Sequence, residues 1–264
     1  LDIFDQDNAK NFKFHVGKVN ILNLGFNYNS RNIIKNLNLE IEGGKSTAIV
    51  GPTGCGKSTL TKLLFRFYDP HKGEILIDNQ KLKDCKMDSI RSIIGVVPQD
   101  TIMFNNTIGY NLAYGNSNAS IKEIRKVVKL CNLDDFIESL DLKYETIVGE
   151  RGLKLSGGEK QRIAIARMML KKPKILILDE ATSALDSKTE KLVLDSIDEY
   201  FKNSTKIIIA HRLTTIRNSD KIVVMSKGKI IEQGKHSNLI KNKGLYYEMW
   251  NKQKEIKKQV NLVN

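Results

Sequence analysis

The stretch GPTGCGKS, Gly51 to Ser58, decides the fold class of this chain. It matches the pattern G-x-x-x-x-G-K-[S/T], and it lies between an apolar run, Ser46–Val50, and a helical pattern that starts at Lys57 and is stopped by Asp69-Pro70. Glycines here let backbone N–H groups wrap around phosphate oxygens, Lys57 supplies a point charge, and the Ser58 hydroxyl is a ligand for Mg²⁺. Strand, loop and helix together therefore predict a binding site for nucleotide phosphates.

A second motif, KILILDE, runs from Lys174 to Glu180 and ends in two acidic residues. Its four apolar residues predict a buried strand, and the two carboxylates follow at the end of that strand. Alone, this pattern also fits a strand with a solvated acidic turn. Beside a phosphate loop, we expect Asp179 to hold a metal ion through water and Glu180 to polarise an attacking water as general base. Strands alternate with helices along the chain, which favours an α/β core with a mainly parallel sheet.

Composition restricts the class of protein. The chain has 264 residues, 41% of them hydrophobic, and a formal net charge of +13. This length allows one large or two small domains, and no apolar run approaches the roughly 18 residues of a membrane span. Lysines spread over solvated faces account for the charge; attraction to phosphate or anionic lipid is the alternative. No basic stripe with interleaved aromatic residues occurs, so nucleic acid is not an expected partner. The three cysteines show no metal-binding spacing.

The sequence LSGGEKQR, Leu155 to Arg162, contains two adjacent glycines. Ser156 and Glu159 fit the S-x-x-E capping box, which places the glycines in the first turn of a helix. Such a helix N-terminus can accept an anion on its free N–H groups. The preceding residues, about 107–145, have apolar residues three and four apart, so we expect a mainly helical insertion.

LSGGEKQ, shortly before KILILDE, resembles the signature sequence of the ATP-binding cassette (ABC) family. The other family motifs then occur in order. Gln99 in VVPQD resembles the Q-loop glutamine, SALD (Ser183 to Asp186) resembles the D-loop, and His211 in IIIAHRL resembles the switch histidine. Tyr28 in FNY resembles the aromatic residue that stacks on adenine, with Phe26 as the alternative.

The resemblance implies an α/β fold: a P-loop NTPase (RecA-like) core with a parallel sheet, an antiparallel β subdomain and a helical signature subdomain. ATP and Mg²⁺ are the implied cofactors, and Lys57, Gln99, Glu180 and His211 are the implied catalytic residues. Ser58, Gln99 and Asp179 are the implied metal ligands. The residues implied to bind nucleotide within one chain are Tyr28, Gly51, Pro52, Thr53, Gly54, Cys55, Gly56, Lys57, Ser58, Thr59 and Gln99.

The resemblance also implies a partner. In the family, two cassettes meet head to tail, and each signature closes on the ATP held by the other. Ser156, Gly157, Gly158, Glu159 and Asp186 are therefore expected to act in trans on the nucleotide of a second copy.

TIVGERG, Thr146 to Gly152, is similar to the X-loop of ABC exporters, which contacts the membrane domain. The sequences of these motifs are most similar to those of B-type exporters, in the multidrug-resistance or heavy-metal-tolerance half-transporter branch. We therefore expect an ATPase coupled to transport, with residues 1–13 as a linker after a transmembrane domain of the same polypeptide, 14–250 as the cassette with a helical subdomain at about 107–170, and 251–264 as a polar tail.

The expected location is a membrane, organellar or plasma, with the cassette on the reducing, ATP-rich side. The alternative is a soluble ABC ATPase that acts on nucleic acid or ribosomes, which the exporter-like TIVGERG disfavours. The substrate is read by the membrane domain, so the cassette does not specify it.

Overall fold

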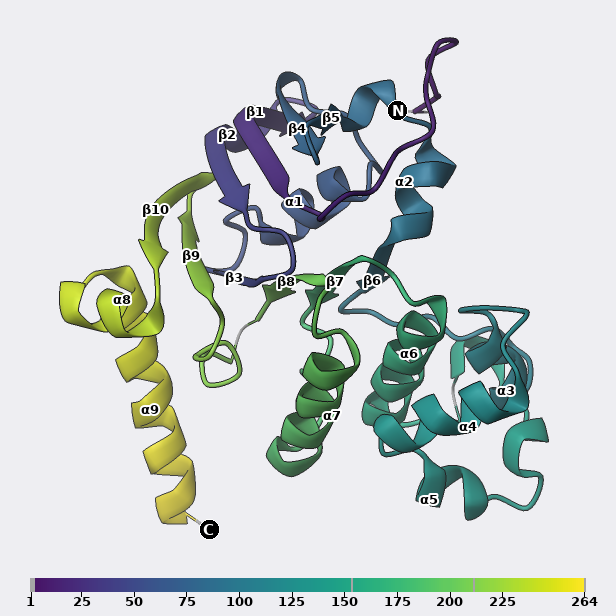
Figure 1. The fold of residues 1–264 in the computed structure, drawn as a ribbon. Coiled ribbons are helices and arrows are strands. Elements are labelled where there is room, and N and C mark those ends of the chain that lie inside the picture. Colours follow the sequence, from purple (N-terminus) through teal and green to yellow (C-terminus); the bar gives the residue numbers. More distant parts are fainter. Residues whose placement is uncertain (1–2, 153, 211, 264) are drawn as a thin grey trace. The chain divides into compact units, whose positions relative to one another are not determined.

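A computed structural model describes residues 3–152, 154–210 and 212–263 of the chain (Figure 1). The chain divides into two compact units. The first comprises Leu1–Ile94, Ile175–Ile177 and Ser204–Asn264, and the second comprises Gly95–Lys174 and Leu178–Asn203. No helix among the described residues is both long enough and apolar enough to cross a membrane.

The first unit contains an antiparallel sheet with strand order β2-β1-β4-β5. Its register places Val19 opposite both Ile41 and Ile77, so the central strand is covered on both edges. Alternate residues of the strands are buried, which is the pattern of a sheet with one face on a core. The strands are β1 (Val19–Tyr28), β2 (Arg31–Ile41), β4 (Lys72–Ile77) and β5 (Gln80–Lys81).

A second sheet has six strands in the order β10-β9-β3-β8-β7-β6. Strand β3 pairs in parallel with β8 and with β9, and β10 runs antiparallel to β9. The four residues Thr47–Val50 of β3 are all buried, as expected for a strand covered on both faces. The strands are β3 (Ser46–Val50), β7 (Ile175–Asp179), β8 (Thr205–Ile209), β9 (Lys221–Ser226) and β10 (Lys229–Gly234). Strand β6 (Ile94–Val97), like β7, contains a boundary between the two units.

The α-helices among the described residues of the first unit are α1 (Lys57–Leu64), α2 (Met87–Ile93), α8 (His236–Asn242) and α9 (Leu245–Val263). Helix α1 was expected to reach about Tyr68, but it ends at Leu64 because Arg66 adopts a left-handed backbone with φ 53°. The Arg66 side chain is buried, and it donates to the carbonyl of Cys85 at 2.7 Å. Helix α9 continues through the segment 251–263, which the sequence analysis assigned to a polar tail.

The residues before β1 are attached to the first unit. Asp78 accepts hydrogen bonds at 2.8–3.1 Å from the four backbone N–H groups of residues 15–18. These bonds lower the pKa of Asp78 against the opposing effect of burial. Further along the lead-in, Asp5 pairs with Arg66 at 3.3 Å. The predicted linker, residues 1–13, therefore contacts this unit through Asp5.

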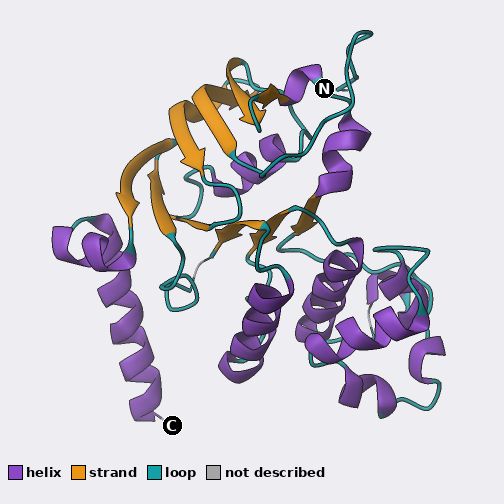
Figure 2. Cartoon of the chain, in the orientation of Figure 1, coloured by secondary structure: helices purple, strands orange, loops and turns teal. Residues whose placement is uncertain are grey.

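Helices make up most of the second unit (Figure 2). Ser120 caps α4 with a capping box to Glu123, and the helix begins where its sequence pattern predicts. Glu123 also pairs with Lys172 at 2.6 Å, and this contact, with the bonds from Ser120, lowers the pKa of Glu123 to about 2. The helices are α3 (Ile108–Ala113), α4 (Ile121–Leu130), α5 (Asp134–Glu138), α6 (Gly157–Lys171) and α7 (Ser187–Tyr200).

Candidate nucleotide site

The phosphate loop follows β3 and leads into α1, as the sequence predicts. Gly54 and Gly56 have φ values of 76° and 111°, a region that favours glycine. A Cβ on Gly51 would meet the carbonyl oxygen of Met225 at 2.1 Å, so β9 requires a glycine there. Around Gly54, by contrast, no atom lies within 4 Å of a built Cβ, so this part of the loop is open to a ligand.

Lys57 is 6% exposed, and its ammonium group donates to the carbonyls of Gly51 at 2.8 Å and Pro52 at 3.2 Å. The charge is therefore held over the loop by the loop's own backbone. The next residue, Ser58, is exposed in the first turn of α1, where its hydroxyl is accessible. An anchored ammonium, an open glycine loop and an exposed hydroxyl fit a nucleotide phosphate with its Mg²⁺.

Two aromatic residues near the end of β1 have different environments. Phe26 is 1% exposed and belongs to the core, so it is not available to stack on a base. Tyr28 is half-buried, and its ring lies 4.9 Å from that of Phe26 and 5.4 Å from that of Tyr68. Among the described residues, its buried hydroxyl has no hydrogen-bond partner. Tyr28 is therefore the aromatic side chain of this pair with an accessible surface.

In the second unit, Ser156 caps α6 with the predicted capping box. The Ser156 hydroxyl accepts from the N–H of Glu159 at 3.2 Å, and the Glu159 carboxylate accepts from the N–H of Ser156 at 2.7 Å. The two glycines occupy the first turn, where Gly157 is exposed and Gly158 half-buried. A Cβ on Gly157 would lie 3.3 Å from the Cβ of Ala184, so the neighbouring loop also favours a small residue there.

A pocket of about 420 Å³ opens at this helix terminus. Asp186 caps α7 beside it by accepting from the N–H groups of Lys188 and Thr189 at 3.0 Å each. Hydrogen bonds from the hydroxyl and the N–H of Thr189 lower the pKa of Asp186, so it is a carboxylate at neutral pH. The pocket is lined by Ser156, Gly157, Gly158, Arg162, Ala184, Leu185, Asp186 and Thr189.

Gln161 makes hydrogen bonds that the sequence does not predict. Gln161 is 4% exposed; its amide group donates to the Ser183 hydroxyl at 2.9 Å and its oxygen accepts from the N–H of Ala184 at 2.9 Å. The amide also donates to the carbonyl of Glu180 at 3.4 Å. Gln161 therefore fixes the loop between Glu180 and Asp186 to the helix that carries the signature. The sequence pattern does indicate that Gln161 is buried, because it lies on the apolar face of α6, four residues before Ile165.

The predicted site residues as a whole are divided between the two units. Gln99 is exposed after β6, in the second unit. Asp179 is 6% exposed at the end of β7, and the half-buried Glu180 follows with a left-handed φ of 51°. His211 lies outside the described residues. The structure thus brings Ser156–Gly158, Glu180 and Asp186 into one unit, and Tyr28 and the phosphate loop into the other.

Comparison with known proteins defines the class. The ABC transporter family model matches residues 34–183, and the chain belongs to this family. It is 48% identical over 254 residues to an ATM1-type heavy metal exporter of Novosphingobium aromaticivorans, covering 96% of this chain and 42% of that protein. A mitochondrial iron-sulfur clusters transporter, atm1 of Aspergillus fumigatus, is 46% identical over 257 residues, covering 96% of this chain and 35% of that protein.

A solved structure of a bacterial Atm1-family ABC exporter with ATP bound superposes with a TM-score of 0.94 at 48% identity, covering 96% of this chain and 45% of that one. The expected ABC fold and the expected exporter branch are confirmed. The multidrug-resistance type, one of the two expected branches, is not supported, because these two relatives carry heavy-metal and iron-sulfur names. The chain spans less than half the length of these relatives.

Proposed function

We propose that this chain is the ATP-binding and ATP-hydrolysing part of a membrane exporter, and that two copies complete each other's sites. The observation that carries this proposal is the open pocket at the N-terminus of α6. Its capped first turn has two residues without side chains, and it presents N–H groups and the positive end of a helix dipole to an anion. The γ-phosphate of ATP on a second copy is the ligand that fits this pocket.

Each residue of the proposed site has its own role in ATP binding or hydrolysis. Lys57 and the glycine loop bind and orient the phosphates, and Tyr28 stacks on the adenine. Ser58, Gln99 and Asp179 would hold Mg²⁺, which when bound would offset phosphate charge. Glu180 accepts a proton from the attacking water, and His211 contacts the γ-phosphate. Loss of that phosphate removes contacts to Ser156 and Gly158 of the other copy, so the pair loosens after each turnover.

Coupling to a membrane domain of the same polypeptide uses the surface beside the signature helix. Arg167 of α6 donates to the backbone oxygen of Ile102 at 2.9 Å and lies over the ring of Phe104, with 5.6 Å to the ring centre. Burial lowers the pKa of Arg167 to about 10, but it remains charged at neutral pH. The segment after Gln99 is therefore attached to the helix whose N-terminus binds the second copy's ATP.

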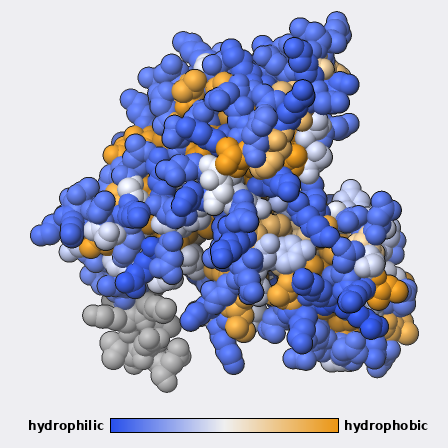
Figure 3. Space-filling view, in the orientation of Figure 1, coloured by the Kyte–Doolittle hydropathy of each residue, from blue (hydrophilic) through white to orange (hydrophobic). Residues whose placement is uncertain are grey.

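The exporter-type loop Thr146–Gly152 joins the same surface. The N–H of Ile108 donates to the carbonyl of Thr146 at 3.0 Å, and the N–H of Val148 donates to that of Asn106 at 3.1 Å. Ile102 and Tyr114 are 72% and 62% exposed here, and Figure 3 shows apolar side chains at the surface of this unit. An exposed apolar surface of this kind marks a contact site, and we assign it to the membrane domain.

The cargo proposed is of the class named for the relatives, a heavy metal or an iron-sulfur compound. The test uses the full-length protein in sealed vesicles with Mg-ATP outside. We expect ATP-dependent uptake of a heavy metal, and loss of that uptake in Glu180→Gln. ATP hydrolysis without any such uptake would contradict the cargo, and uptake unaffected by Glu180→Gln would contradict the role of this chain.

A further inference from the structure

The turn between β9 and β10 lies against the phosphate loop. Residues 227 and 228 form the tip of this hairpin, and the N–H of Gly228 donates to the carbonyl of Cys55 in the phosphate loop at 3.1 Å. The carbonyl of Gly228 in turn accepts from the N–H of Lys35 in β2 at 3.0 Å. The hairpin tip therefore joins the phosphate loop to β2, an edge strand of the antiparallel sheet.

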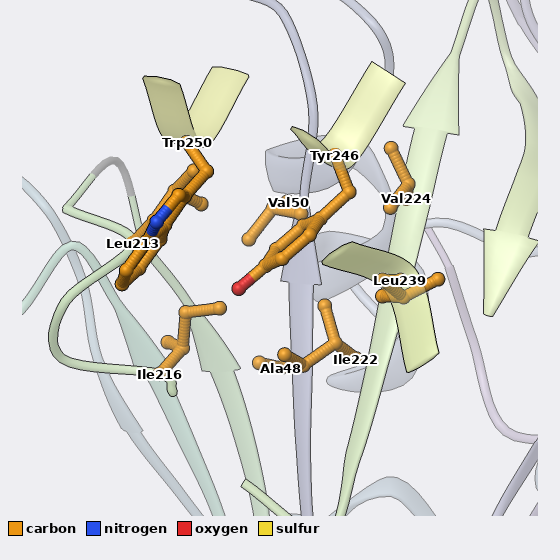
Figure 4. Close-up of a cluster of buried hydrophobic side chains, with 9 residues drawn as sticks. All are labelled: Ala48, Val50, Leu213, Ile216, Ile222, Val224, Leu239, Tyr246 and Trp250. Carbon is orange, nitrogen blue, oxygen red and sulfur yellow. The ribbon is translucent and has the colours of Figure 1, made fainter. Parts of the chain in front are cut away.

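The strands that lead to the phosphate loop and to this hairpin tip are paired. Val50, the last residue of β3, lies opposite Val224 of β9 in the parallel register. Both residues are fully buried in one hydrophobic cluster, which Figure 4 shows. One residue further along each strand, a Cβ on Gly51 would meet the carbonyl oxygen of Met225 at 2.1 Å. The end of β9 therefore lies directly against the start of the phosphate loop.

The hydrogen bond to Cys55 fixes a peptide plane of the phosphate loop. The peptide bond between Cys55 and Gly56 is trans, and in a trans peptide the carbonyl and the following N–H point in opposite directions. Because the Cys55 carbonyl points to the hairpin tip, the N–H of Gly56 points away from it. Gly56 has no side chain to restrict this plane. A loop that binds phosphate through N–H groups gains affinity when such groups are oriented before the ligand arrives.

The backbone at the hairpin tip requires a glycine. Gly228 has a φ of 81°, and a Cβ there would meet the carbonyl oxygen of Ile33 at 2.2 Å. Since that oxygen belongs to the backbone, a side chain at position 228 displaces the tip. Gly73 is in a comparable position in β4, with a φ of 73° and the carbonyl oxygen of Leu22 at 2.2 Å from a built Cβ. Gly73 lies within the antiparallel sheet, so it serves as a matched control.

We propose that Gly228 is a positioning residue for nucleotide binding, which holds the phosphate loop in the conformation that binds ATP. The inference rests on the proposed function, because that function assigns the phosphate loop to ATP. Gly228 does not touch the nucleotide. Its N–H fixes the carbonyl of Cys55, and its own carbonyl is fixed by Lys35, so β2 acts on the phosphate loop through the hairpin tip.

The first test removes one hydrogen bond from the hairpin tip in the full-length protein. Lys35→Pro deletes the N–H that donates to Gly228, whereas Lys35→Ala keeps this N–H and removes only an exposed side chain. Proline is tolerated here because β2 is an edge strand and the N–H points away from its partner β1. We expect Lys35→Pro to raise the calorimetric Kd for a non-hydrolysable ATP analogue about three- to tenfold, and Lys35→Ala to leave it within about twofold.

The second test separates nucleotide binding from stability. Gly228→Ala and Gly73→Ala each place a methyl group against a backbone oxygen at the same distance, so both variants should lower Tm by similar amounts. Of the two, Gly228→Ala should raise the Kd about tenfold, and Gly73→Ala should leave it within about twofold.

Hydrogen exchange of the wild-type protein supplies a measurement that needs no variant. Nucleotide that orders the phosphate loop should also suppress opening of the bond between Gly228 and Cys55. Peptides that contain Gly228 should therefore gain more protection on addition of Mg-ATP than peptides that contain Gly73.

Three results would overturn the inference. They are equal Kd values in Lys35→Pro and Lys35→Ala, equal increases of Kd in the two glycine variants, and an exchange rate at Gly228 that Mg-ATP leaves unchanged. The last result is decisive even if a variant fails to fold. Lys57→Ala distinguishes the inference from the proposed function. Normal binding in Lys57→Ala refutes the proposed function, whereas lost binding there beside normal binding in Lys35→Pro and Gly228→Ala refutes only the role of Gly228.

Discussion

The contact of Gln161 with the loop between Glu180 and Asp186 gives a prediction of measurable size. Gln161→Ala removes two hydrogen bonds of 2.9 Å, to Ser183 and Ala184, and leaves the N–H of Ala184 without its acceptor. At about 0.5–1.5 kcal/mol net for each bond, the loss of unfolding free energy is about 1–3 kcal/mol. For a domain of this size, that loss lowers Tm by roughly 2–10 °C.

The assay combines thermal unfolding with the rate of ATP hydrolysis. The rate should fall as well as Tm, because the amide of Gln161 also holds the carbonyl of Glu180, the residue proposed as general base. Gln161→Glu keeps the acceptor for Ala184 and should lose less stability than Gln161→Ala. Lys160→Ala, on the same helix, is the control. An unchanged Tm together with an unchanged rate in Gln161→Ala would refute the reasoning.

Three further predictions concern single side chains. Lys57→Ala should abolish ATP binding at micromolar concentration, because it removes the charge held over the phosphate loop. Its control is Lys83→Ala, which changes an exposed lysine outside this loop. Unchanged calorimetric binding in Lys57→Ala would refute the phosphate assignment. Tyr28→Ala should weaken ATP binding by about 1–3 kcal/mol if the ring stacks on the base, while Tyr28→Phe keeps the affinity; equal affinities in both variants would remove that role. The pKa of Glu123 is lowered to about 2, so its contribution to stability is present above the unfolded pKa near 4.3 and is lost as the pH falls towards 2. The Tm difference between wild type and Glu123→Gln should therefore narrow between about pH 4.5 and 2. A constant Tm difference would contradict the Lys172 pairing.

The local features of the fold could be predicted from the sequence. A run of apolar residues before Gly51 and a helical pattern after Lys57 are sufficient for the strand, loop and helix, since each depends on neighbouring residues alone. The capping boxes at Ser120 and Ser156 are also local, with partners three residues apart. These elements position most of the predicted site residues.

Contacts between distant segments could not be predicted in the same way. Helix α1 stops four residues early because Arg66 turns into a buried site formed by Asp5 and the carbonyl of Cys85. The hydrogen bonds of Gln161 and Gln253 likewise join them to loops about 20 and 40 residues away. A pattern of polar and apolar residues marks such side chains as buried, but it does not name their partners. The cassette motifs are shared by exporters whose membrane domains differ, so they do not specify the cargo.

The central claim is that each ATP site is completed by a second copy of this chain. The most direct measurement is sedimentation velocity of the Glu180→Gln variant, with and without Mg-ATP. The account predicts a monomer of 29.9 kDa without nucleotide and a dimer with it, and the dimer should be lost when Ser156→Glu places a carboxylate in the signature pocket. A monomer at saturating ATP, or a dimer that forms equally well without nucleotide or with Ser156→Glu, would contradict the claim.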